Sequence, residues 1–459
     1  MNDDTIIAVA TPPGRGAIGI VRLSGTDARA IAGGMFAPRA GAPLAERPAC
    51  MAVLGRVTDG DDVIDHAIAV AYRAPRSYTG EDVVEISCHG GPAVLERVIG
   101  TAMRLGARPA APGEFTRRAF LNGKIDLTQA EAVADLIAAP TDRVRSAALR
   151  QLEGAFGTAL EPVRAACVAL LAELEAGIDF PEDAGETFDG GAMAARIEPV
   201  AARIASLADG AAPGRMLRDG FTVVIAGRPN TGKSSLLNRL AREERALVTP
   251  IAGTTRDAVE ADVNVDGFPV RLIDTAGVRA AKGAIERKGI ERTHAAMNAC
   301  DLVLWVADRS RRPARGEVED ACTRIGGRNA IWVWNKMDAP PRWPAKTAAE
   351  VPAALQPVAV SALTGDGMHA LHQRLAAGVR AAAGAAEESG VLVRARHRAL
   401  LDRAARALRR ARETSRTRAL PELVAADVRE ALNAVGEITG VVTSDDVLDR
   451  IFAEFCIGK

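Results

Sequence analysis

The sequence predicts a multidomain protein with an N-terminal α+β domain, a discontinuous helical domain, and an α/β domain inserted into the helical one. The 459 residues are too many for one domain and suggest about three. Short β-type runs separated by Gly and Pro fill the first ~120 residues. Apolar residues then recur at helical steps on both sides of a central region in which apolar strands alternate with helices.

Composition sets limits on the remaining possibilities. The chain carries 58 basic and 58 acidic residues, so any nucleic-acid contact has to come from a local patch. The N-terminus lacks a basic and then apolar signal segment, and no apolar run approaches the ~18 residues that span a bilayer. We therefore expect a cytoplasmic protein without a membrane partner. The six cysteines form no C-x-x-C pair, so the sequence indicates neither a zinc site nor a disulfide framework. They are Cys50, Cys88, Cys167, Cys300, Cys322 and Cys456.

The predicted N-terminal α+β domain covers residues 1–121. Its strands are expected in the runs TIIAVA, AIGIVRLSG, HAIAVAYRA and DVVEISCHG, and a helix in PAVLERVIGTAMRLGA.

The predicted helical domain has two parts, residues 122–217 and 384–459, which pack together. A first helix face is marked by Ala130, Val133, Ala134 and Ile137. The seam of one long amphipathic helix follows at three- and four-residue steps, through Leu149, Leu152, Phe156, Leu160, Val163, Cys167, Leu170 and Leu174.

The inserted domain, residues 218–383, contains the pattern G-x-x-x-x-G-K-S between an apolar strand and a helix. Gly227 and Gly232 allow the backbone N–H groups to turn toward phosphates, and the helix N-terminus adds its dipole. Lys233 is then expected on the β- and γ-phosphates and Ser234 on Mg²⁺. The pattern predicts a P-loop.

Three further motifs follow apolar strands. In DTAG, Asp274 can hold a water of Mg²⁺ and the N–H of Gly277 can contact the γ-phosphate. In NKMD, Asp338 can accept from guanine N1–H and the exocyclic amine, while Asn335 faces the other edge of the base. In the SAL motif at Ser361, a backbone N–H can reach guanine O6.

Together the motifs predict a Ras-like P-loop GTPase domain that binds GTP with Mg²⁺. The expected GTP-binding residues are Asn230, Thr231, Gly232, Lys233, Ser234, Ser235, Thr249, Pro250, Ile251, Ala252, Gly253, Thr254, Thr255, Asp274, Thr275, Ala276, Gly277, Asn335, Lys336, Asp338, Ser361 and Ala362.

The loop between the P-loop and DTAG carries two threonines. We assign Thr255 to Mg²⁺ beside Ser234, although spacing alone also allows Thr254. Val278 stands where Ras-like enzymes place a water-orienting Gln, and valine cannot orient water. Glu286 or Glu291 can substitute, or both can be solvated helix residues that pair with neighbouring arginines.

Over nearly its whole length the chain resembles the MnmE (TrmE) family of tRNA modification GTPases. The resemblance rests on TPPGRGAIGIVRLSG, SYTGEDVVEISCHGGP, APGEFTRRAFLNGKIDLTQAEAVADLI, GRPNTGKSSLLN, IAGTTRD, DTAGVR, NKMD and the terminal FCIGK. It implies a homodimer that works in a heterotetramer with an FAD-dependent partner of the MnmG (GidA) type. Together they add a carboxymethylaminomethyl-type group at C5 of the wobble uridine of certain tRNAs.

The resemblance also implies cofactors. A 5-formyltetrahydrofolate-type folate is expected at Arg22, Glu85, Lys124 and Lys459. A K⁺ ion that activates hydrolysis through pairing of two GTPase domains is expected at Asn230, Thr249, Ile251 and Thr254. Glu286 matches the carboxylate that orients the attacking water, so Glu286 and Lys233 are the expected catalytic residues.

Two features near the C-terminus remain open. Cys456 is either a nucleophile toward uracil C6, activated by Lys459, or a buried cysteine at a helix end. Ten arginines from Arg394 to Arg418, with His397 among them, form either a solvated helix face or a contact for tRNA phosphates.

Two other functions share the motifs. A GTP-dependent switch, such as a ribosome-assembly GTPase, needs no folate site. Folate binding therefore distinguishes a tRNA modification GTPase from such a switch. A phosphotransferase needs an acceptor for the phosphoryl group. Phosphate release without an acceptor therefore distinguishes a GTPase from a phosphotransferase.

Overall fold

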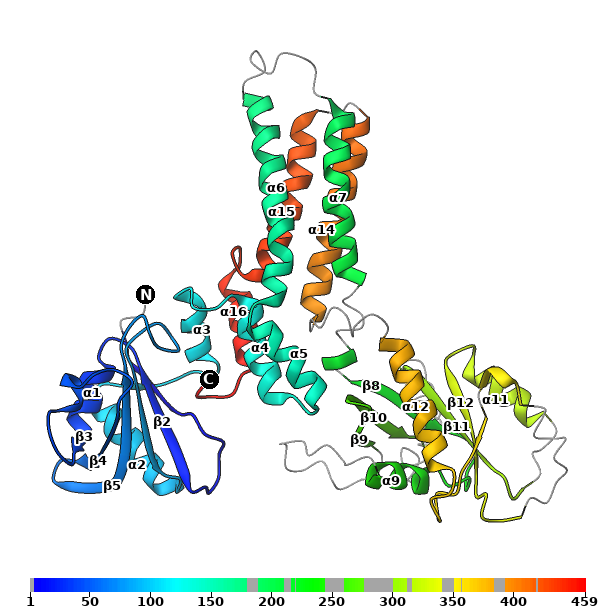
Figure 1. The fold of residues 1–459 in the computed structure, drawn as a ribbon, viewed down its shortest axis with the longest axis horizontal. Coiled ribbons are helices and arrows are strands. Elements are labelled where there is room, and N and C mark those ends of the chain that lie inside the picture. Colours follow the sequence, from blue (N-terminus) through cyan, green and yellow to red (C-terminus); the bar gives the residue numbers. More distant parts are fainter. Residues whose placement is uncertain are drawn as a thin grey trace, which may run out of the picture. The chain divides into compact units, whose positions relative to one another are not determined.

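The computed structural model describes residues 4–179, 189–209, 216–218, 220–243, 260–275, 300–311, 316–340, 351–355, 357–383, 393–417 and 420–459. The chain divides into two compact units (Figure 1). The first comprises Met1–Ala134, Gly157–Glu161 and Asn433–Lys459, and the second comprises Asp135–Phe156 and Pro162–Leu432.

The first unit is built on a seven-stranded sheet of order β3-β4-β5-β6-β2-β1-β7. All neighbours are antiparallel except β1 and β7. The predicted α+β class of this part is confirmed. The strands are β1 (Ile6–Val9), β2 (Ile18–Ser24), β3 (Phe36–Pro38), β4 (Ala52–Asp59), β5 (Asp62–Tyr72), β6 (Val83–His89) and β7 (Arg108–Pro109).

The two faces of this sheet differ. One face packs against α1 (Ala28–Met35) and α2 (Pro92–Arg104), with the short helix η1 (Leu44–Glu46) beside α1. The opposite face, which we call the open face, carries Ile18, Leu54 and Ile68, which are 62%, 51% and 44% exposed. Alternation along each strand explains the difference, because neighbouring residues point to opposite faces.

A buried guanidinium connects three segments of the first unit. Arg118 lies on α3 (Glu114–Leu121), and its side chain is 7% exposed. It donates to Asp4 Oδ1 at 2.7 Å, to Glu81 Oε2 at 3.1 Å and to Glu114 Oε1 at 3.1 Å. The Arg118 guanidinium therefore joins three segments: α3, the segment that precedes β6, and the residues before β1. The unit is completed by α16 (Asp445–Ala453) and parts of α4 (Leu127–Ala138), α6 (Ala155–Asp179) and α15 (Pro421–Thr439).

The second unit contains a six-stranded sheet of order β13-β12-β11-β8-β10-β9, in which only β9 runs antiparallel to its neighbour. Helices α9 (Lys233–Glu243) and α12 (Met368–Ala383) cover one face, and α11 (Glu317–Ile325) and η4 (Ala353–Leu355) cover the other. The strands are β8 (Phe221–Ala226), β9 (Glu260–Val265), β10 (Phe268–Asp274), β11 (Leu302–Asp308), β12 (Ala330–Asn335) and β13 (Val358–Ala359).

Four helices from both parts of the predicted helical domain lie side by side in Figure 1: α6, α7 (Gly190–Asp209), α14 (Ala395–Arg416) and α15. Ion pairs join neighbouring helices. Arg196 of α7 pairs with Glu173 of α6, and Arg410 of α14 donates to Asp427 of α15 at 2.9 Å. The prediction that residues far apart in sequence form one helical domain is confirmed.

The predicted single long helix from Leu149 is wrong. The chain forms α5 (Asp142–Leu152), turns at Gly154 with φ of 89°, and restarts as α6. A left-handed glycine ends a helix because no side chain opposes that conformation. Leu149 is accordingly 38% exposed, and Ile137 on α4 is 53% exposed, so neither belongs to the predicted core.

The α6 helix also corrects the expectation about apolar runs. By length and composition it is long and apolar enough to cross a membrane. Of its apolar stretch of 18 residues, 33% is buried inside the protein. Its remaining predicted seam residues are buried in the protein: Phe156, Leu160, Val163, Cys167, Leu170 and Leu174.

Replacing Arg118 with Met tests the buried network. We expect a loss of about 3–5 kcal/mol in the free energy of unfolding, because three carboxylates would lose their shared cation. Arg117→Met is the matched control, since its partners Asp445 and Asp449 are 90% and 60% exposed. It should cost less than about 1 kcal/mol. Urea denaturation measures both, and equal losses would contradict the role assigned to Arg118.

Candidate functional site

The loop between β8 and α9 is held close to its surroundings by two glycines. Gly227 has φ of 142°, and a Cβ there would lie 2.2 Å from Val306 O. Gly232 has φ of 91°, and a Cβ there would lie 2.3 Å from Asn335 Nδ2. Both positions therefore require glycine for backbone conformation and for space.

Two polar side chains begin α9. Lys233 is 5% exposed, and its Nζ donates to Arg228 O at 2.7 Å. The Ser234 hydroxyl donates to Asp274 Oδ2 at 2.5 Å, so the P-loop serine and the DTAG aspartate meet. Ser235 is exposed in the same turn. A hydroxyl beside a carboxylate is the type of oxygen donor set that Mg²⁺ prefers.

Strand register explains why these motifs meet. In the parallel sheet, Ile225 of β8 lies opposite Asp274 of β10 and opposite Leu304 of β11, while Asp308 of β11 lies opposite Asn335 of β12. The carboxyl ends of β8, β10, β11 and β12 therefore share one edge, where open α/β sheets bind their ligands.

Asn335 links three of the predicted motifs. Its side chain is buried, donates from Nδ2 to Thr231 O at 2.9 Å, and accepts from the N–H of Ala362 at 3.0 Å. Asp338 accepts from the Ser361 hydroxyl at 2.5 Å. The structure thus brings together the P-loop, NKMD and SAL segments.

Lys336 has a partner that the sequence analysis missed. Its Nζ donates to Asn230 O at 2.8 Å and to Asp308 Oδ2 at 2.7 Å. Burial alone would raise the pKa of Asp308, but hydrogen bonds from Lys336 and Ser310 outweigh it, so the pKa is lowered. The position of Asp308 at the end of an apolar strand, like that of Asp274, was the available signal.

The remaining predicted nucleotide residues divide into two groups. Thr275 is described, and its N–H and hydroxyl both donate to Ile225 O, at 3.2 and 3.0 Å. The others lie outside the described residues: Thr249, Pro250, Ile251, Ala252, Gly253, Thr254, Thr255, Ala276, Gly277 and Glu286.

Three of the four predicted folate residues gather in the first unit. Arg22 Nε donates to Glu85 Oε1 at 2.8 Å, and its Nη1 lies 3.5 Å from Gly458 O. Burial and the nearby charge of Arg22 lower the pKa of Lys459, although Glu85 opposes this shift. Lys124 instead donates to Pro75 O at 2.9 Å, and no described hydrogen bond joins it to the other three.

Aromatic rings support Arg22, and sequence reasoning missed them. The guanidinium carbon lies 5.4 Å from the ring centroid of Tyr78 and 5.7 Å from that of Phe115. The Tyr78 hydroxyl is 2.8 Å from Thr116 Oγ1. Tyr78 lies in the quoted SYTGEDVVEISCHGGP segment, but no spacing rule connects it with Arg22.

The segment after α16 reaches the same region. Gly458 has φ of 99°, and a Cβ there would lie 2.1 Å from Val9 O. The N–H of Gly113 donates to Cys456 O at 3.4 Å. The Cys456 side chain is exposed, so the alternative of a buried cysteine is wrong.

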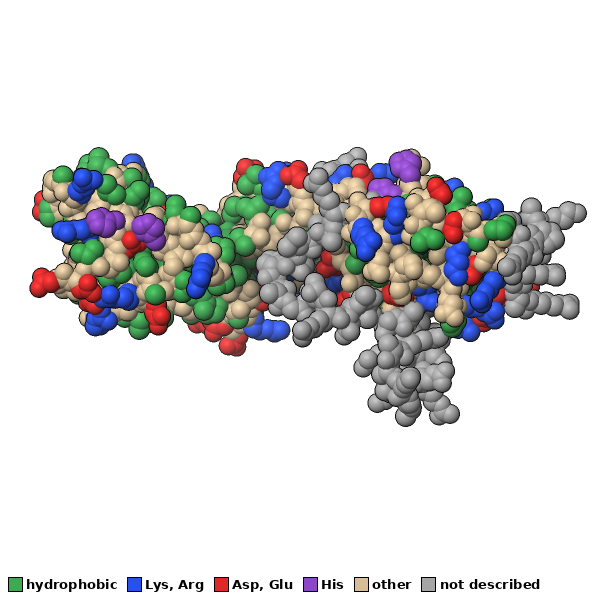
Figure 2. Space-filling view, turned by 90° about the horizontal axis from the view of Figure 1, so that it is seen from below, with side chains coloured by type: hydrophobic (Ala, Val, Ile, Leu, Met, Phe, Trp, Pro, Cys, Tyr) green, Lys and Arg blue, Asp and Glu red, His purple; other side chains and the backbone are tan. Residues whose placement is uncertain are grey.

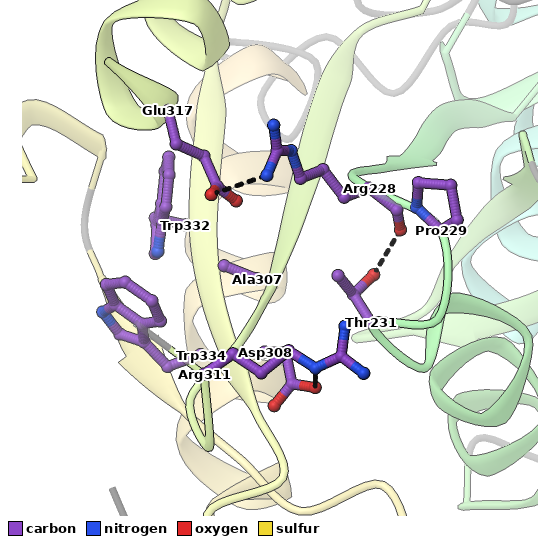
Figure 3. Close-up of a pocket in the computed structure, with 9 residues that line it drawn as sticks. All are labelled: Arg228, Pro229, Thr231, Ala307, Asp308, Arg311, Glu317, Trp332 and Trp334. Carbon is purple, nitrogen blue, oxygen red and sulfur yellow. Dashed lines mark hydrogen bonds and ion pairs between the residues drawn. The ribbon is translucent and has the colours of Figure 1, made fainter. Parts of the chain in front are cut away.

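A pocket of about 90 Å³ lies beside the P-loop (Figure 3). Across it, Arg228 pairs with Glu317 at 3.1 Å, and the Thr231 hydroxyl donates to Arg228 O at 3.0 Å. Thr231 is the one predicted GTP-binding residue in its lining, so this pocket is not the predicted nucleotide site.

Solved structures match about a third of the chain. A variant of Aquifex aeolicus Era bound to GDP.AlF4- is 26% identical and covers 34% of this chain and 56% of its own, with a TM-score of 0.27. The G domain of the T. maritima FeoB iron transporter is 23% identical, with a TM-score of 0.25. The match covers 35% of this chain and 99% of the FeoB chain.

Comparisons of sequence extend over the whole chain. The profile described as GTP-binding protein TrmE N-terminus matches residues 5–124, and the MnmE helical domain profile matches residues 127–456. The tRNA modification GTPase MnmE of Symbiobacterium thermophilum is 46% identical over 100% of both chains. That of Chloroflexus aurantiacus is 47% identical, also over 100% of both. The chain therefore belongs to the MnmE family of tRNA modification GTPases.

Proposed function

We propose that this GTPase adds a carboxymethylaminomethyl-type group at C5 of the wobble uridine of certain tRNAs, together with an FAD-dependent partner of the MnmG (GidA) type. The observation that carries this proposal is the similarity to MnmE proteins over the full length of both chains. In this proposal the reaction takes place in the cytoplasm. The domains are proposed at residues 1–121, 122–217 with 384–459, and 218–383.

In this proposal the nucleotide site uses its residues in separate roles. Lys233 contacts the β- and γ-phosphates, while Ser234 and Thr255 hold Mg²⁺, which neutralises charge on the phosphates. The contact between Ser234 and Asp274 supports this assignment, because it gathers oxygen donors at the start of α9. Asp338 and Asn335 select guanine.

Hydrolysis requires a further charge and an oriented water. We assign K⁺ to Asn230, Thr249, Ile251 and Thr254, and the water to Glu286. Asn230 has φ of 65° and its carbonyl accepts from Lys336, so this P-loop position is held by the neighbouring motif. The positive charge takes the role of an arginine finger.

GTP hydrolysis in KCl and NaCl tests this assignment. We expect K⁺ to raise the rate by about tenfold or more over Na⁺, since an arginine finger contributes at least that much. Glu286→Ala should abolish the rise, and Glu291→Ala, the matched control, should keep it. Equal rates in both salts with full activity of Glu286→Ala would favour a GTP-dependent switch instead.

A folate of the 5-formyltetrahydrofolate type is proposed at Arg22, Glu85 and Lys459, with Lys124 as a further contact. The Glu85 carboxylate is positioned by Arg22 and by the Tyr72 hydroxyl, 3.4 Å from its Oε2. An oriented carboxylate can accept from the amino and ring N–H groups of a pterin. Cys456 stands as a candidate nucleophile in the adjoining segment.

Glu85→Gln tests the folate site. We expect binding of 5-formyltetrahydrofolate, measured by calorimetry, to weaken about 10- to 100-fold, because hydrogen bonds to a charged acceptor are lost. Glu96→Gln is the control, because Glu96 is exposed on α2. Unchanged affinity in a folded Glu85→Gln variant would place the folate elsewhere.

We propose that the open face of the first unit binds a second copy of this chain. The face is apolar at Ile18, Leu54 and Ile68, whereas the opposite face is already covered by α1 and α2. Exposed apolar patches of this kind mark interaction sites. The homodimer expected from the family provides the occupant.

The double variant Leu54→Glu, Ile68→Glu tests the dimer surface. Two carboxylates on an apolar interface would stay unpaired on burial, so we expect the dimer to dissociate to monomers in sedimentation velocity. Leu105→Glu is the control, because Leu105 is also 44% exposed but follows α2 on the covered side of the sheet. A dimer that persists in the double variant would exclude this face.

A further inference from the structure

The arginines of α14 are not equivalent. On the side toward α7, Arg412 donates to Glu198 at 2.6 Å and Arg398 donates to Ala208 O at 2.6 Å. On the side toward α15, Arg410 donates to Asp427 at 2.9 Å and to Glu430 at 2.5 Å. These arginines join α14 to its neighbouring helices.

Three other arginines lie between these two sides. Arg406, Arg409 and Arg416 are exposed, and within the part of the chain that the structure describes none of them makes an ion pair. We call them the arginine ridge. Glu413 is exposed on the same side, so the ridge with this glutamate carries a net charge of about +2 at neutral pH.

The spacing places the ridge along one side of the helix. Positions 406, 409 and 416 are separated by three and seven residues, which are one and two turns. At 1.5 Å per residue the ridge spans about 15 Å. A row of cations of this length matches a ligand whose negative charges repeat every few ångströms, rather than a single carboxylate.

The chemistry of the side chains favours phosphate. A guanidinium offers planar paired donors that fit phosphate oxygens bidentately, and α14 contains no lysine. On the face shown in Figure 2, basic and acidic side chains are interspersed. A polyanion therefore has to be recognised by a local row such as this one, because the net charge of the chain is zero.

We propose that the arginine ridge of α14 contacts the phosphate backbone of a folded RNA. The proposal rests on the tRNA-modification function, which makes tRNA the partner. It separates the two alternatives for the arginine cluster residue by residue: Arg398, Arg410 and Arg412 are structural, whereas Arg406, Arg409 and Arg416 face the ligand.

The test is the salt dependence of tRNA binding by the full-length protein and by the triple variant Arg406→Gln, Arg409→Gln, Arg416→Gln. Each lost phosphate contact should reduce the slope of log K against log salt by about 0.9. We expect the slope to fall by about 2 to 3 and the affinity at about 100 mM salt to fall at least tenfold. Fluorescence anisotropy of labelled unmodified tRNA measures both.

Two variants on the same helix control for charge and for folding. Arg410→Gln removes one positive charge but breaks the pairs with Asp427 and Glu430, so it should lower the unfolding midpoint and leave the salt slope unchanged. Glu413→Gln removes the negative charge from the ridge and should strengthen tRNA binding a few-fold. GTP hydrolysis should match the wild type in the triple variant.

Three results would overturn the proposal. Wild-type binding with an unchanged slope in the triple variant would exclude the ridge and leave tRNA modification standing. Absence of tRNA binding by the wild type would contradict both the role of the ridge and the proposed tRNA modification. If the triple variant instead loses binding only to vesicles of phosphatidylcholine and phosphatidylserine, the ridge is a membrane contact.

Discussion

The pairing of β8 with parallel strands on both sides is the constraint on which the nucleotide site depends. Its register against β10 and β11 is fixed by backbone hydrogen bonds, and β12 continues the same direction. The four parallel strands β8, β10, β11 and β12 consequently deliver their last residues to one edge. The Ser234–Asp274 contact and the bridge made by Asn335 are consequences of that register rather than of local sequence.

This dependence explains which parts of the site could be predicted. Each motif begins where an apolar strand ends, so the motifs and the strand pattern located the P-loop, DTAG and NKMD segments. Parallel topology then brings these segments together. Asp308 was missed because it belongs to no recognised motif, although its strand ends in the same way. The helical seam was predicted across Gly154 because apolar spacing continues through the break, and only the backbone angle reveals it.

The first unit could be predicted less completely. Alternating runs indicated its strands, but Arg22 and Glu85 are 63 residues apart and meet only through the antiparallel pairing of β2 with β6. The rings of Tyr78 and Phe115 beside Arg22 follow no spacing rule. Family resemblance selected the charged residues, whereas the aromatic support and the Arg118 network required coordinates.

The approach of Gly458 to the carbonyl of Val9 has a consequence for biosynthesis. Arg22 and Gly458 are separated by 436 residues, so the ribosome completes the β-sheet carrying Arg22 long before it makes the segment that covers it. At typical rates of translation the interval is about 20 to 90 s. Throughout that time the nascent N-terminal domain lacks the segment that approaches Arg22 and Val9, so a chain released early lacks these contacts even when its sheet has folded.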